Sequence, residues 1–303
     1  MSKKTLRVSN HSIGVTNTEK VFFPADGITK GDLVGYYYQV ASTMLRHVRG
    51  RPVSMLRFPD GIRDGGFFHK EVPGHFPEWI RRATIPKKEG GKVTHAVCDD
   101  AAALVYLADQ ACITPHVWLS RADQPDLPDR LIFDLDPTTT DLGPVRDAAR
   151  GFRELLGELG LVPFVMTTGS RGFHVLVPLR RGAGFDDTRE FAQDAARLLA
   201  SRAPDTLTVD LPKERRGDRV FLDYLRNSYA QTSVAPYAVR AKPAAPVATP
   251  LAWDELATTG PQDFTMHNLL QRLESDGDPW SNVTNRARSL DGPRRRLNQL
   301  LNR

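Results

Sequence analysis

Two aspartates stand one residue apart in an apolar run near the middle of the chain, residues 131–137 (LIFDLDP). Such a run is typical of a buried strand. Because successive side chains of a strand point to opposite faces, Asp134 and Asp136 share one face. Two neighbouring buried carboxylates are costly unless a cation or a proton separates them, and a divalent metal held by oxygen ligands is the obvious partner. The alternative is a strand that ends in a turn, with both aspartates solvated.

A third aspartate, Asp223, stands in another apolar run, residues 219–225 (RVFLDYL). Three carboxylates can hold two divalent ions, an arrangement that aligns the attacking and leaving oxygens in phosphoryl transfer. We therefore expect Asp134, Asp136 and Asp223 to form one metal site. The alternative for Asp223 is a single carboxylate at a strand end, paired with Arg226.

A glycine-flanked turn, residues 169–174 (GSRGFH), lies between two further apolar runs. Glycines such as Gly172 allow positive φ and close approach, so that backbone N–H groups can bind phosphate oxygens. Ser170 adds a hydroxyl, Arg171 a bidentate phosphate donor and His174 another donor. The pattern favours phosphate binding over the alternative of a plain hairpin turn.

Aromatic side chains occur beside cations, since Phe67 and Phe68 precede His69 and Lys70. This arrangement can stack a nucleic-acid base and hold its phosphate. Two adjacent aromatics are equally consistent with positions in the hydrophobic core. His116, beside an aromatic in the run TPHVW, is by itself typical of a structural histidine.

The basic residues are unevenly spread along the 303-residue chain, whose formal net charge is +5 and whose pI is about 9.3. Lysines and arginines gather in residues 46–63, 87–92, 213–219 and 286–303. Each run alone is typical of a solvated face, but several together favour a nucleic-acid partner.

The composition disfavours other classes. The two cysteines form neither a CxxC motif nor a disulfide framework. The first residues carry no apolar signal segment, and the longest apolar run, residues 101–108, is too short to cross a membrane. With 40% hydrophobic and 25% charged residues, we expect a soluble cytoplasmic protein without a membrane partner.

Apolar spacing and turn residues predict a mixed order of helices and strands. Helices are expected at residues 32–48, 99–111, 145–159 and 185–200, and short strands at 53–58, 66–70, 131–135, 162–168, 173–179 and 219–225. Residues 242–250 (KPAAPVATP) predict an extended segment on the surface, followed by a peripheral helical part. The strand spacing is too irregular for a βαβ array. We expect an α+β fold with a mostly antiparallel sheet that carries acidic residues on one face.

The pattern hydrophobic-Asp-x-Asp followed by threonines resembles the first motif of haloacid dehalogenase-type phosphatases, in which the first aspartate is the nucleophile. That motif normally lies near the start of the chain and has a glycine after the second aspartate. Here about 130 residues precede it, and Pro137 takes the glycine position. No downstream acidic pair with a preceding lysine completes the set, so this alternative is disfavoured.

The assembled motifs resemble a known family. LIFDLDP, TTGSRGFHVLVPL and RVFLDYLRNSYAQTSVAPYAVR, in this order, are similar to the polymerase domain of bacterial DNA ligase D, which belongs to the archaeo-eukaryotic primase superfamily. The agreement extends to NTEKVFFPADGITKGDLVGYYYQVA, GRPVSMLRFPDGI and GGFFHKEVP in the N-terminal half and to PVATPLAWDEL further on. The resemblance covers roughly residues 13–275.

The resemblance implies a primase-polymerase fold, with an RNA-recognition-motif-like sheet in a primase-like catalytic core beside a second subdomain. We expect one domain over residues 1–303, made of an N-terminal subdomain to about residue 120, a catalytic sheet over about 121–240, and a Pro/Ala-rich wrap with C-terminal helices over about 241–303. Because no ligase or phosphoesterase segment follows in the sequence, we expect a stand-alone polymerase or an excised domain.

The resemblance also implies an activity. This is template-dependent addition of NTP or dNTP to DNA ends and gaps bearing a 5′-phosphate, often with ribonucleotides preferred, using two Mn²⁺ or Mg²⁺ ions. The hypothesis is that metal ions on the three aspartates activate a primer 3′-hydroxyl for in-line attack on the α-phosphate, releasing pyrophosphate. End joining with a Ku-type protein and a separate ligase is one pathway for such an enzyme, and gap repair is another.

Each matching residue acquires a role from the resemblance. The metal-binding carboxylates match Asp134, Asp136 and Asp223. The nucleotide-binding positions match Ser170, Arg171, Gly172, His174, His116 and Arg240, the last being a triphosphate contact. The DNA-binding positions match Lys20 and Lys30 for the 5′-phosphate, Phe67 and Phe68 for stacking, and Arg57 and Lys70. Two positions depart from the pattern: Leu56 stands where some relatives carry a lysine, and Arg171 replaces a lysine, which changes the geometry of the charge.

A non-catalytic DNA-end-binding protein is the rival class. It would use the basic runs alone, and it predicts salt-sensitive DNA binding without metal-dependent nucleotide incorporation. The three aspartates argue against this class, because carboxylates near a phosphate backbone repel DNA unless they carry metal.

Overall fold

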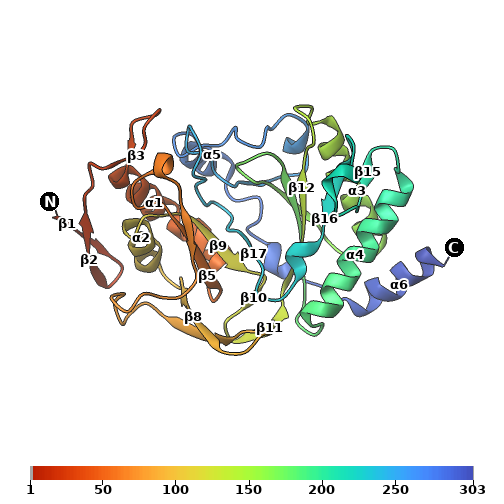
Figure 1. Ribbon diagram of the computed structural model, residues 1–303, viewed down its shortest axis with the longest axis horizontal. Coiled ribbons are helices and arrows are strands. Elements are labelled where there is room, and N and C mark those ends of the chain that lie inside the picture. The colour runs from red at the N-terminus through yellow and green to blue at the C-terminus, as the bar shows by residue number, and fades with distance from the viewer. Residues whose placement is uncertain (1–2, 303) are drawn as a thin grey trace. The chain divides into compact units, whose positions relative to one another are not determined.

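The computed structural model describes residues 3–302, and the chain forms two compact units (Figure 1). The first unit takes in the residues up to 123, 232–248 and 264–278, and the second takes in 124–231, 249–263 and the residues from 279 onward. The division expected from the sequence sets one boundary near residue 120 but treats residues 241–303 as a single part. The structure divides that part between both units, because its successive segments pack alternately in one unit and in the other.

An antiparallel sheet forms the centre of the first unit. Its strands are β5 (Pro52–Arg57), β6 (Phe67–His69), β7 (Arg82–Pro86), β8 (Lys92–Val97), β9 (Cys112–Trp118) and β17 (Thr232–Val234). Their order is β17–β9–β5–β8–β7, and β6 also pairs with β5. The unit also contains β1 (Lys3–Val8), β2 (His11–Thr16), β3 (Val21–Phe23), β4 (Ile28–Thr29), β10 (Ser120–Arg121), α1 (Lys30–Val48), α2 (Ala101–Asp109), α5 (Leu269–Asp276) and the 3-10 helix η1 (Ile62–Asp64).

Helix α1 begins with a capping box. The Thr29 hydroxyl accepts a hydrogen bond from the N–H of Asp32 at 3.2 Å, and the Asp32 carboxylate accepts one from the N–H of Thr29 at 2.8 Å. Apolar and aromatic residues recur at helical spacing on the inner face, where Leu33, Tyr36 and Tyr37 are buried. The helix predicted over residues 32–48 is confirmed and starts two residues earlier.

The second unit contains a six-stranded sheet. Its strands are β12 (Arg130–Asp136), β13 (Phe164–Thr167), β14 (Phe173–Pro178), β15 (Leu207–Thr208), β16 (Val220–Asp223) and β18 (Pro250–Leu251). Their order is β15–β16–β12–β14–β13–β18, and every pair except β15 with β16 is antiparallel. The other elements are β11 (Gln124–Pro128), α3 (Gly143–Glu158), α4 (Phe185–Arg202), α6 (Asp291–Leu301) and the 3-10 helices η2 (Lys213–Arg215), η3 (Leu225–Asn227), η4 (Glu255–Ala257) and η5 (Val283–Arg286).

The two faces of strand β12 have different surroundings. Leu131, Phe133 and Leu135 are fully buried, and Phe133 stacks on Phe152 of α3 with ring centroids 3.9 Å apart. Helices α3 and α4 pack on this face of the sheet (Figure 1). Because strand side chains alternate, the even-numbered residues, including Asp134, lie on the opposite face. The apolar residues of the run thus bury one face of the sheet and leave the other for the carboxylates.

The surface position predicted for residues 242–250 is wrong from residue 245 onward, where the segment is buried. Val247 and Ala248 are fully buried. The backbone is hydrogen-bonded on two sides, since the N–H of Tyr237 donates to the Ala248 carbonyl at 2.7 Å and the N–H of Val247 donates to the Phe264 carbonyl at 2.7 Å. Small apolar side chains fit such a confined position, and composition alone does not distinguish it from an exposed Pro/Ala-rich segment.

The region after residue 253 is less helical than predicted. Short helices alternate with irregular segments, and Trp280 is 1% exposed rather than peripheral. Its indole N–H donates to the Val165 carbonyl at 3.2 Å, so it packs beside strand β13. Among residues 3–302, no helix is both long and apolar enough to span a membrane.

Asn227 in η3 completes the edge of β12 where its pairing with β16 ends. Its side chain is fully buried. The side-chain oxygen accepts from the N–H of Ile132 at 2.8 Å, and the amide nitrogen donates to the carbonyls of Ile132 at 2.7 Å and Tyr224 at 2.8 Å. The Asn227 amide therefore makes the two bonds to Ile132 that a further residue of β16 would have made in a longer ladder.

We expect Asn227→Ala to lower the free energy of unfolding by about 2–4 kcal/mol, because it leaves a buried N–H and a buried carbonyl of β12 without partners. Asn285→Ala, at an exposed position of η5, is the control and should change the free energy of unfolding by less than about 0.5 kcal/mol. Urea unfolding measures both values. An equal decrease in the free energy of unfolding for both variants would contradict the role of Asn227 as the hydrogen-bond partner of β12.

Candidate active site

The register of three strands brings the predicted polar residues of the second unit together. Asp134 lies directly opposite Asp223 in the β12–β16 pair and directly opposite His174 in the β12–β14 pair. Directly opposite side chains share a face, with Cβ atoms about 4.5–5.5 Å apart. Asp136 lies two residues further along β12 and so shares this face. The four side chains form one polar cluster on the face turned away from α3 and α4.

The Asp134 carboxylate is largely enclosed, with 16% of its side chain exposed. One oxygen lies 3.3 Å from Nε2 of His174, and the other lies 3.4 Å from Nε of Arg226. Burial raises the pKa of this carboxyl, but the charge and hydrogen bond of His174, and then those of Arg226, outweigh burial and lower the pKa to about 2. Asp134 is therefore ionised at neutral pH.

Asp223 lies in a different electrostatic environment. Burial raises its pKa, the N–H of Leu225 opposes that rise by donating to Oδ1 at 2.7 Å, and the negative charge of Asp134 raises it further. Arg226 makes its ion pair with Asp134, whereas the alternative expected from the sequence paired it with Asp223. Two carboxylates that face each other across a ladder repel, so a cation bound between them would stabilise both in the ionised form.

Asp136 and Arg171 form a third charged contact. The guanidinium Nη2 of Arg171 lies 2.8 Å from Oδ2 of Asp136, and the two side chains are 66% and 45% exposed. An ion pair that is this exposed contributes little to stability, because water screens it. Arg171 can therefore exchange the carboxylate for a phosphate at small cost.

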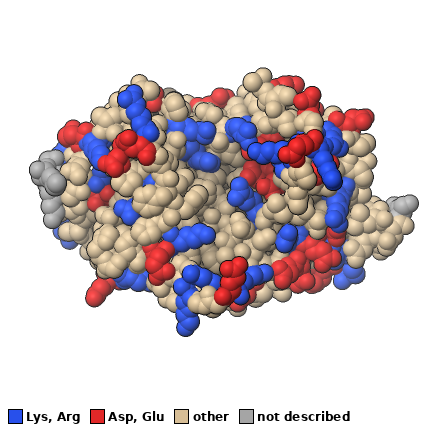
Figure 2. Space-filling model, in the orientation of Figure 1, with Lys and Arg blue, Asp and Glu red and all other residues tan. Residues whose placement is uncertain are grey.

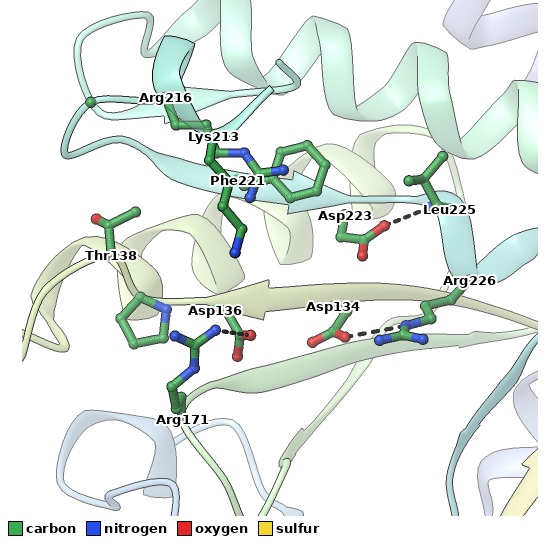
Figure 3. Close-up of a pocket in the computed structure, with 12 residues that line it drawn as sticks. Asp134, Asp136, Thr138, Arg171, Lys213, Arg216, Phe221, Asp223, Leu225 and Arg226 are labelled. Carbon is green, nitrogen blue, oxygen red and sulfur yellow. Dashed lines mark hydrogen bonds and ion pairs between the residues drawn. The ribbon is translucent and has the colours of Figure 1, made fainter. Parts of the chain in front are cut away.

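A cleft of about 480 Å³ lies over these side chains (Figure 3). Its charged lining consists of Asp134, Asp136, Asp223, Arg171, Lys213, Arg216 and Arg226. Oxygen ligands for cations and donors for anions thus share one cavity, as binding of a metal-bound triphosphate requires.

Lys213 and Arg216 are cleft residues that sequence reasoning did not assign to the site. Both belong to the basic run 213–219, which predicted only a general nucleic-acid partner. The 3-10 helix η2 and the turn after it bring them to the cleft, where Lys213 projects into the cavity (Figure 3). The guanidinium of Arg216 lies 3.8 Å from the ring centroid of Phe221, which holds this side chain over the end of β16.

The turn between β13 and β14 is organised by Thr168. The Thr168 hydroxyl accepts from the N–H of Ser170 at 3.2 Å and from that of Gly172 at 3.3 Å. Gln262 donates its amide to the Ser170 carbonyl at 2.6 Å. The N–H groups of Ser170 and Gly172 are thus engaged within the turn, and the contact of Gly172 with a nucleotide stays a prediction. The turn instead places the Ser170 and Arg171 side chains.

Gly172 has a packing role that follows from its position. A Cβ atom built there would lie 1.8 Å from the Leu135 carbonyl oxygen, so only glycine lets the turn approach β12 this closely. The close approach places Arg171 beside Asp136, the residue after Leu135.

The aspartates fit a divalent metal by their chemistry. Residues 3–302 contain no group of three or more His, Cys, Asp or Glu side chains whose positions already suit a metal ion. Asp134 is instead paired with His174 and Arg226, Asp136 with Arg171, and Asp223 accepts from the N–H of Leu225. Their oxygens are nevertheless the ligands that Mg²⁺ and Mn²⁺ prefer, and two of the aspartates are opposed within one cluster. The three carboxylates therefore suit either metal ion once the basic side chains that contact Asp134 and Asp136 give way to it.

The first unit carries the predicted DNA-contacting aromatics on β6. Phe67 and Phe68 are 49% and 53% exposed, so the alternative that places them in the core is wrong. Phe68 packs edge-on against His116 of β9 with ring centroids 5.1 Å apart. Arg57 lies over the Phe67 ring at 5.8 Å, and Lys70 is exposed. Exposed aromatics flanked by cations suit base stacking.

The remaining predicted basic residues also lie in the first unit but differ in exposure. Lys20 forms an exposed ion pair with Asp60 at 2.6 Å. Lys30 is 7% exposed, and its ammonium lies 2.7 Å from the buried carboxylate of Asp109. Because a DNA phosphate would have to displace that buried pair, the contact predicted for Lys30 gains no support from its position. Arg240 is half-buried in the segment after β17.

Charges of both signs cover the surface shown in Figure 2. Lysine and arginine side chains are interspersed there with aspartate and glutamate. The excess of basic residues therefore does not by itself locate a DNA-binding surface.

A sheet that presents three carboxylates beside an arginine-bearing turn defines a class of protein, the nucleotidyltransferases that handle metal-bound triphosphates. Comparison with known proteins identifies the group within this class. The model of the LigD primase-polymerase domain family matches residues 29–280, and the chain belongs to this family. The predicted family and the predicted enzyme class are confirmed.

Several relatives are similar over most of the chain. The multifunctional non-homologous end joining DNA repair protein LigD of Mycobacterium tuberculosis is 34% identical over 279 residues, which are 89% of this chain and 37% of that protein. LigD of Pseudomonas aeruginosa is 32% identical over 300 residues, 96% of this chain and 35% of that protein. The chain thus spans little more than a third of these relatives.

A solved structure supports the same assignment. The polymerase domain from Mycobacterium tuberculosis Ligase D in complex with DNA matches with a TM-score of 0.84 and 33% identity, covering 91% of this chain and 99% of that chain. The predicted α+β primase-polymerase fold is confirmed.

We expect Gly172→Ala to lower the free energy of unfolding by about 1–3 kcal/mol, because the new methyl group collides with the backbone of β12. Gly182→Ala, where a Cβ atom meets nothing within 4 Å, is the matched control and should be nearly neutral. Denaturant unfolding compares the two variants. If both were equally stable, the tight approach of the turn to β12 would be refuted.

Proposed function

We propose that this chain is a template-dependent nucleotidyltransferase that extends the 3′ end of DNA at gaps and at double-strand-break ends, with ribonucleotides preferred. The observation that carries the proposal is the cluster of Asp134, Asp136 and Asp223 on one face of a sheet, in one cleft with Arg171. Nucleotidyl transfer needs carboxylates that hold divalent cations and basic groups that hold phosphates. DNA as the substrate is supported by the relative solved with DNA.

The side chains of the cleft have two roles, metal binding and phosphate binding. Asp134, Asp136 and Asp223 would hold Mn²⁺ or Mg²⁺, which when bound supplies Lewis-acid activation of the primer hydroxyl and neutralises phosphate charge. Arg171 leaves Asp136 and binds the triphosphate. Lys213 lies in the same cleft and offsets charge that develops on the phosphate oxygens.

Neighbouring residues orient these groups. Arg226 and His174 keep Asp134 ionised and fix its two oxygens in direction. Ser170, carried on the Thr168-organised turn, offers a hydroxyl to a phosphate oxygen. Arg240 belongs to the first unit, and its contact with the triphosphate is what the resemblance implies.

DNA and base contacts belong to the first unit. Phe67 and Phe68 present exposed rings on which a base can stack, and Arg57 and Lys70 neutralise the backbone beside them. His116, edge-on to Phe68, contacts the nucleotide. Lys20 is the basic residue available for a 5′-phosphate, while Lys30 would first have to leave Asp109.

The biological setting is part of the proposal. The relatives of M. tuberculosis and P. aeruginosa are end-joining proteins, which supports end joining in the bacterial cytoplasm as the pathway. A Ku-type DNA-end-binding protein and a ligase activity are the partners that this pathway requires. A polymerase that fills a gap leaves a nick, so its product must be consumed by a ligation reaction.

We expect Asp134→Asn combined with Asp136→Asn to slow nucleotide addition on gapped DNA by about 10³-fold or more, because the ligands for the cations are lost. DNA binding, measured by fluorescence anisotropy, should remain at least as tight. Asp147→Asn combined with Asp205→Asn makes the same charge change at exposed positions of the second unit and should extend primers normally.

Primer extension with Mn²⁺ or Mg²⁺, with and without a 5′-phosphate at the gap, measures this effect. Undiminished addition by the Asp134/Asp136 variant would refute the assignment. Salt-sensitive DNA binding by the unsubstituted protein, without incorporation in either metal, would favour the rival non-catalytic DNA-end binder.

We expect Phe67→Ala combined with Phe68→Ala to weaken binding of gapped DNA about tenfold or more while leaving the melting temperature unchanged, because the rings are exposed and each stacked base contributes about 1–3 kcal/mol. Tyr38→Ala removes an aromatic ring of similar exposure, 53%, from α1 and is the control. Titration of labelled gapped DNA compares the affinities. Equal affinity of the double variant and the unsubstituted protein would remove the stacking role.

A further inference from the structure

The segment that carries Arg240 leaves the sheet of the first unit shortly before that arginine. Strand β17 pairs with β9, and beyond it the N–H of Ala235 still donates to the Pro115 carbonyl at 3.1 Å. Tyr237, two residues further on, has a φ of 68°, a left-handed conformation that is unfavourable for tyrosine. The chain therefore reaches Arg240 through a strained turn that has left the ladder.

The hydroxyl of Tyr37 lies where the hydrogen bonds between β17 and β9 would otherwise have continued. It donates to the Ile113 carbonyl at 2.6 Å and accepts from the N–H of Val239 at 3.1 Å. Alternate carbonyls of a strand point to the same side, so the Ile113 carbonyl faces the same edge of β9 as the Pro115 carbonyl. In a continued ladder, a backbone N–H would donate to the Ile113 carbonyl and a backbone carbonyl would accept from the N–H of Val239. The Tyr37 hydroxyl makes both of these bonds instead.

Thr114 provides a second bridge between the same two segments. Its hydroxyl donates to the Val239 carbonyl at 2.6 Å, so both backbone polar groups of Val239 are bonded to buried hydroxyls. Arg240 is the next residue along this segment, and His116 lies two residues beyond Thr114 on β9. These hydroxyl bonds join Val239 to β9, the strand of His116, whereas the N–H of Arg240 itself donates to the Pro246 carbonyl at 2.7 Å, outside β9. The spacing of the Arg240 segment from β9 therefore depends on the hydroxyl bonds.

We propose that Tyr37 is a positioning residue for nucleotide binding, and that its buried hydroxyl fixes Arg240 at the spacing from β9 at which Arg240 and His116 bind one nucleotide. The inference rests on the proposed function, which assigns nucleotide contacts to these two residues. Tyr37 acts only through the backbone of Val239 and does not touch the nucleotide.

The surroundings of the Tyr37 hydroxyl fit this role. The side chain is 1% exposed. Burial, followed by the neighbouring Cys112 and Tyr36, raises the pKa of the hydroxyl well above its ordinary value, and the N–H of Val239 and the charge of Arg240 act in the opposite direction. The hydroxyl therefore stays protonated and donates to β9, and the guanidinium of Arg240 lies within its electrostatic reach.

Other hydrogen bonds hold the strained turn at Tyr237. The Tyr36 hydroxyl donates to the Tyr237 carbonyl at 2.8 Å, and the Tyr237 hydroxyl donates to Asp278 at 2.7 Å. These bonds hold residue 237 but join neither Val239 nor β9. Tyr36 therefore offers a matched control, because it lies in the same helix, is 3% exposed and makes one hydroxyl bond to the same turn.

The test measures steady-state extension of gapped DNA by the full chain. We expect Tyr37→Phe to raise KM for the nucleotide about fivefold, the effect of one hydrogen bond of about 1 kcal/mol, with kcat and the affinity for gapped DNA unchanged. Tyr36→Phe should lower the melting temperature to a similar degree but leave KM for the nucleotide unchanged. An equal rise in KM for Tyr36→Phe would overturn the proposal, since general loosening of the turn would then explain both variants.

A double-mutant cycle separates positioning from structural loss. Arg240→Ala alone should raise KM for the nucleotide, and Tyr37→Phe should add nothing in that background, because both substitutions remove the same interaction. Additive effects on KM would overturn the positioning role. If Arg240→Ala leaves KM unchanged, the nucleotide contact assigned to Arg240 fails. If Arg240→Ala raises KM but Tyr37→Phe does not, the proposed function stands and the inference about Tyr37 fails.

Discussion

The antiparallel register of β12 with β14 and β16 is the constraint on which the site depends. It places Asp134 opposite Asp223 on one side and opposite His174 on the other, while the alternate residues of β12 pack against α3 and α4. A shift of one residue would turn the carboxylates toward the helices and the apolar residues toward the cleft. Burial of Leu131, Phe133 and Leu135 therefore fixes the position of the carboxylates as firmly as it fixes the core.

Basic side chains contact two of the carboxylates that this register brings together. Arg226 and His174 hold Asp134, and Arg171 holds Asp136. The contacts of Asp134 keep that carboxylate ionised, which is the state that a metal ion requires. The ion pairs are also exchangeable, since a metal ion that takes the carboxylate releases the guanidinium for a phosphate. Under the proposed function, a bound metal ion would take the place of Arg171 on Asp136 and free Arg171 for the triphosphate, so that binding of the metal and binding of the triphosphate would favour each other.

The sequence was sufficient for features that depend on local patterns. Alternation along residues 131–137 predicted the shared face of Asp134 and Asp136, because strand geometry is the same in every sheet. Features that depend on distant partners were not predictable in this way. Lys30 is buried only because Asp109 lies beside it, and Val247 is buried only because residue 264 pairs with it. The basic run 213–219 indicated a nucleic-acid partner but not that Lys213 and Arg216 line the cleft. Their position there depends on the 3-10 helix η2 and the turn after it.

The two groups of site residues are held in place by unequal means. The carboxylates of the second unit are fixed by a ladder of backbone bonds and by buried apolar neighbours. The segment of Arg240 in the first unit is joined to β9 instead by the hydroxyls of Tyr37 and Thr114, because it has left the ladder and the N–H of Arg240 donates to the Pro246 carbonyl. Each such bond contributes only about 1 kcal/mol. Under the proposed function, substitutions near these hydroxyls would therefore change the affinity for the nucleotide, while the ladder that holds the carboxylates stays the same.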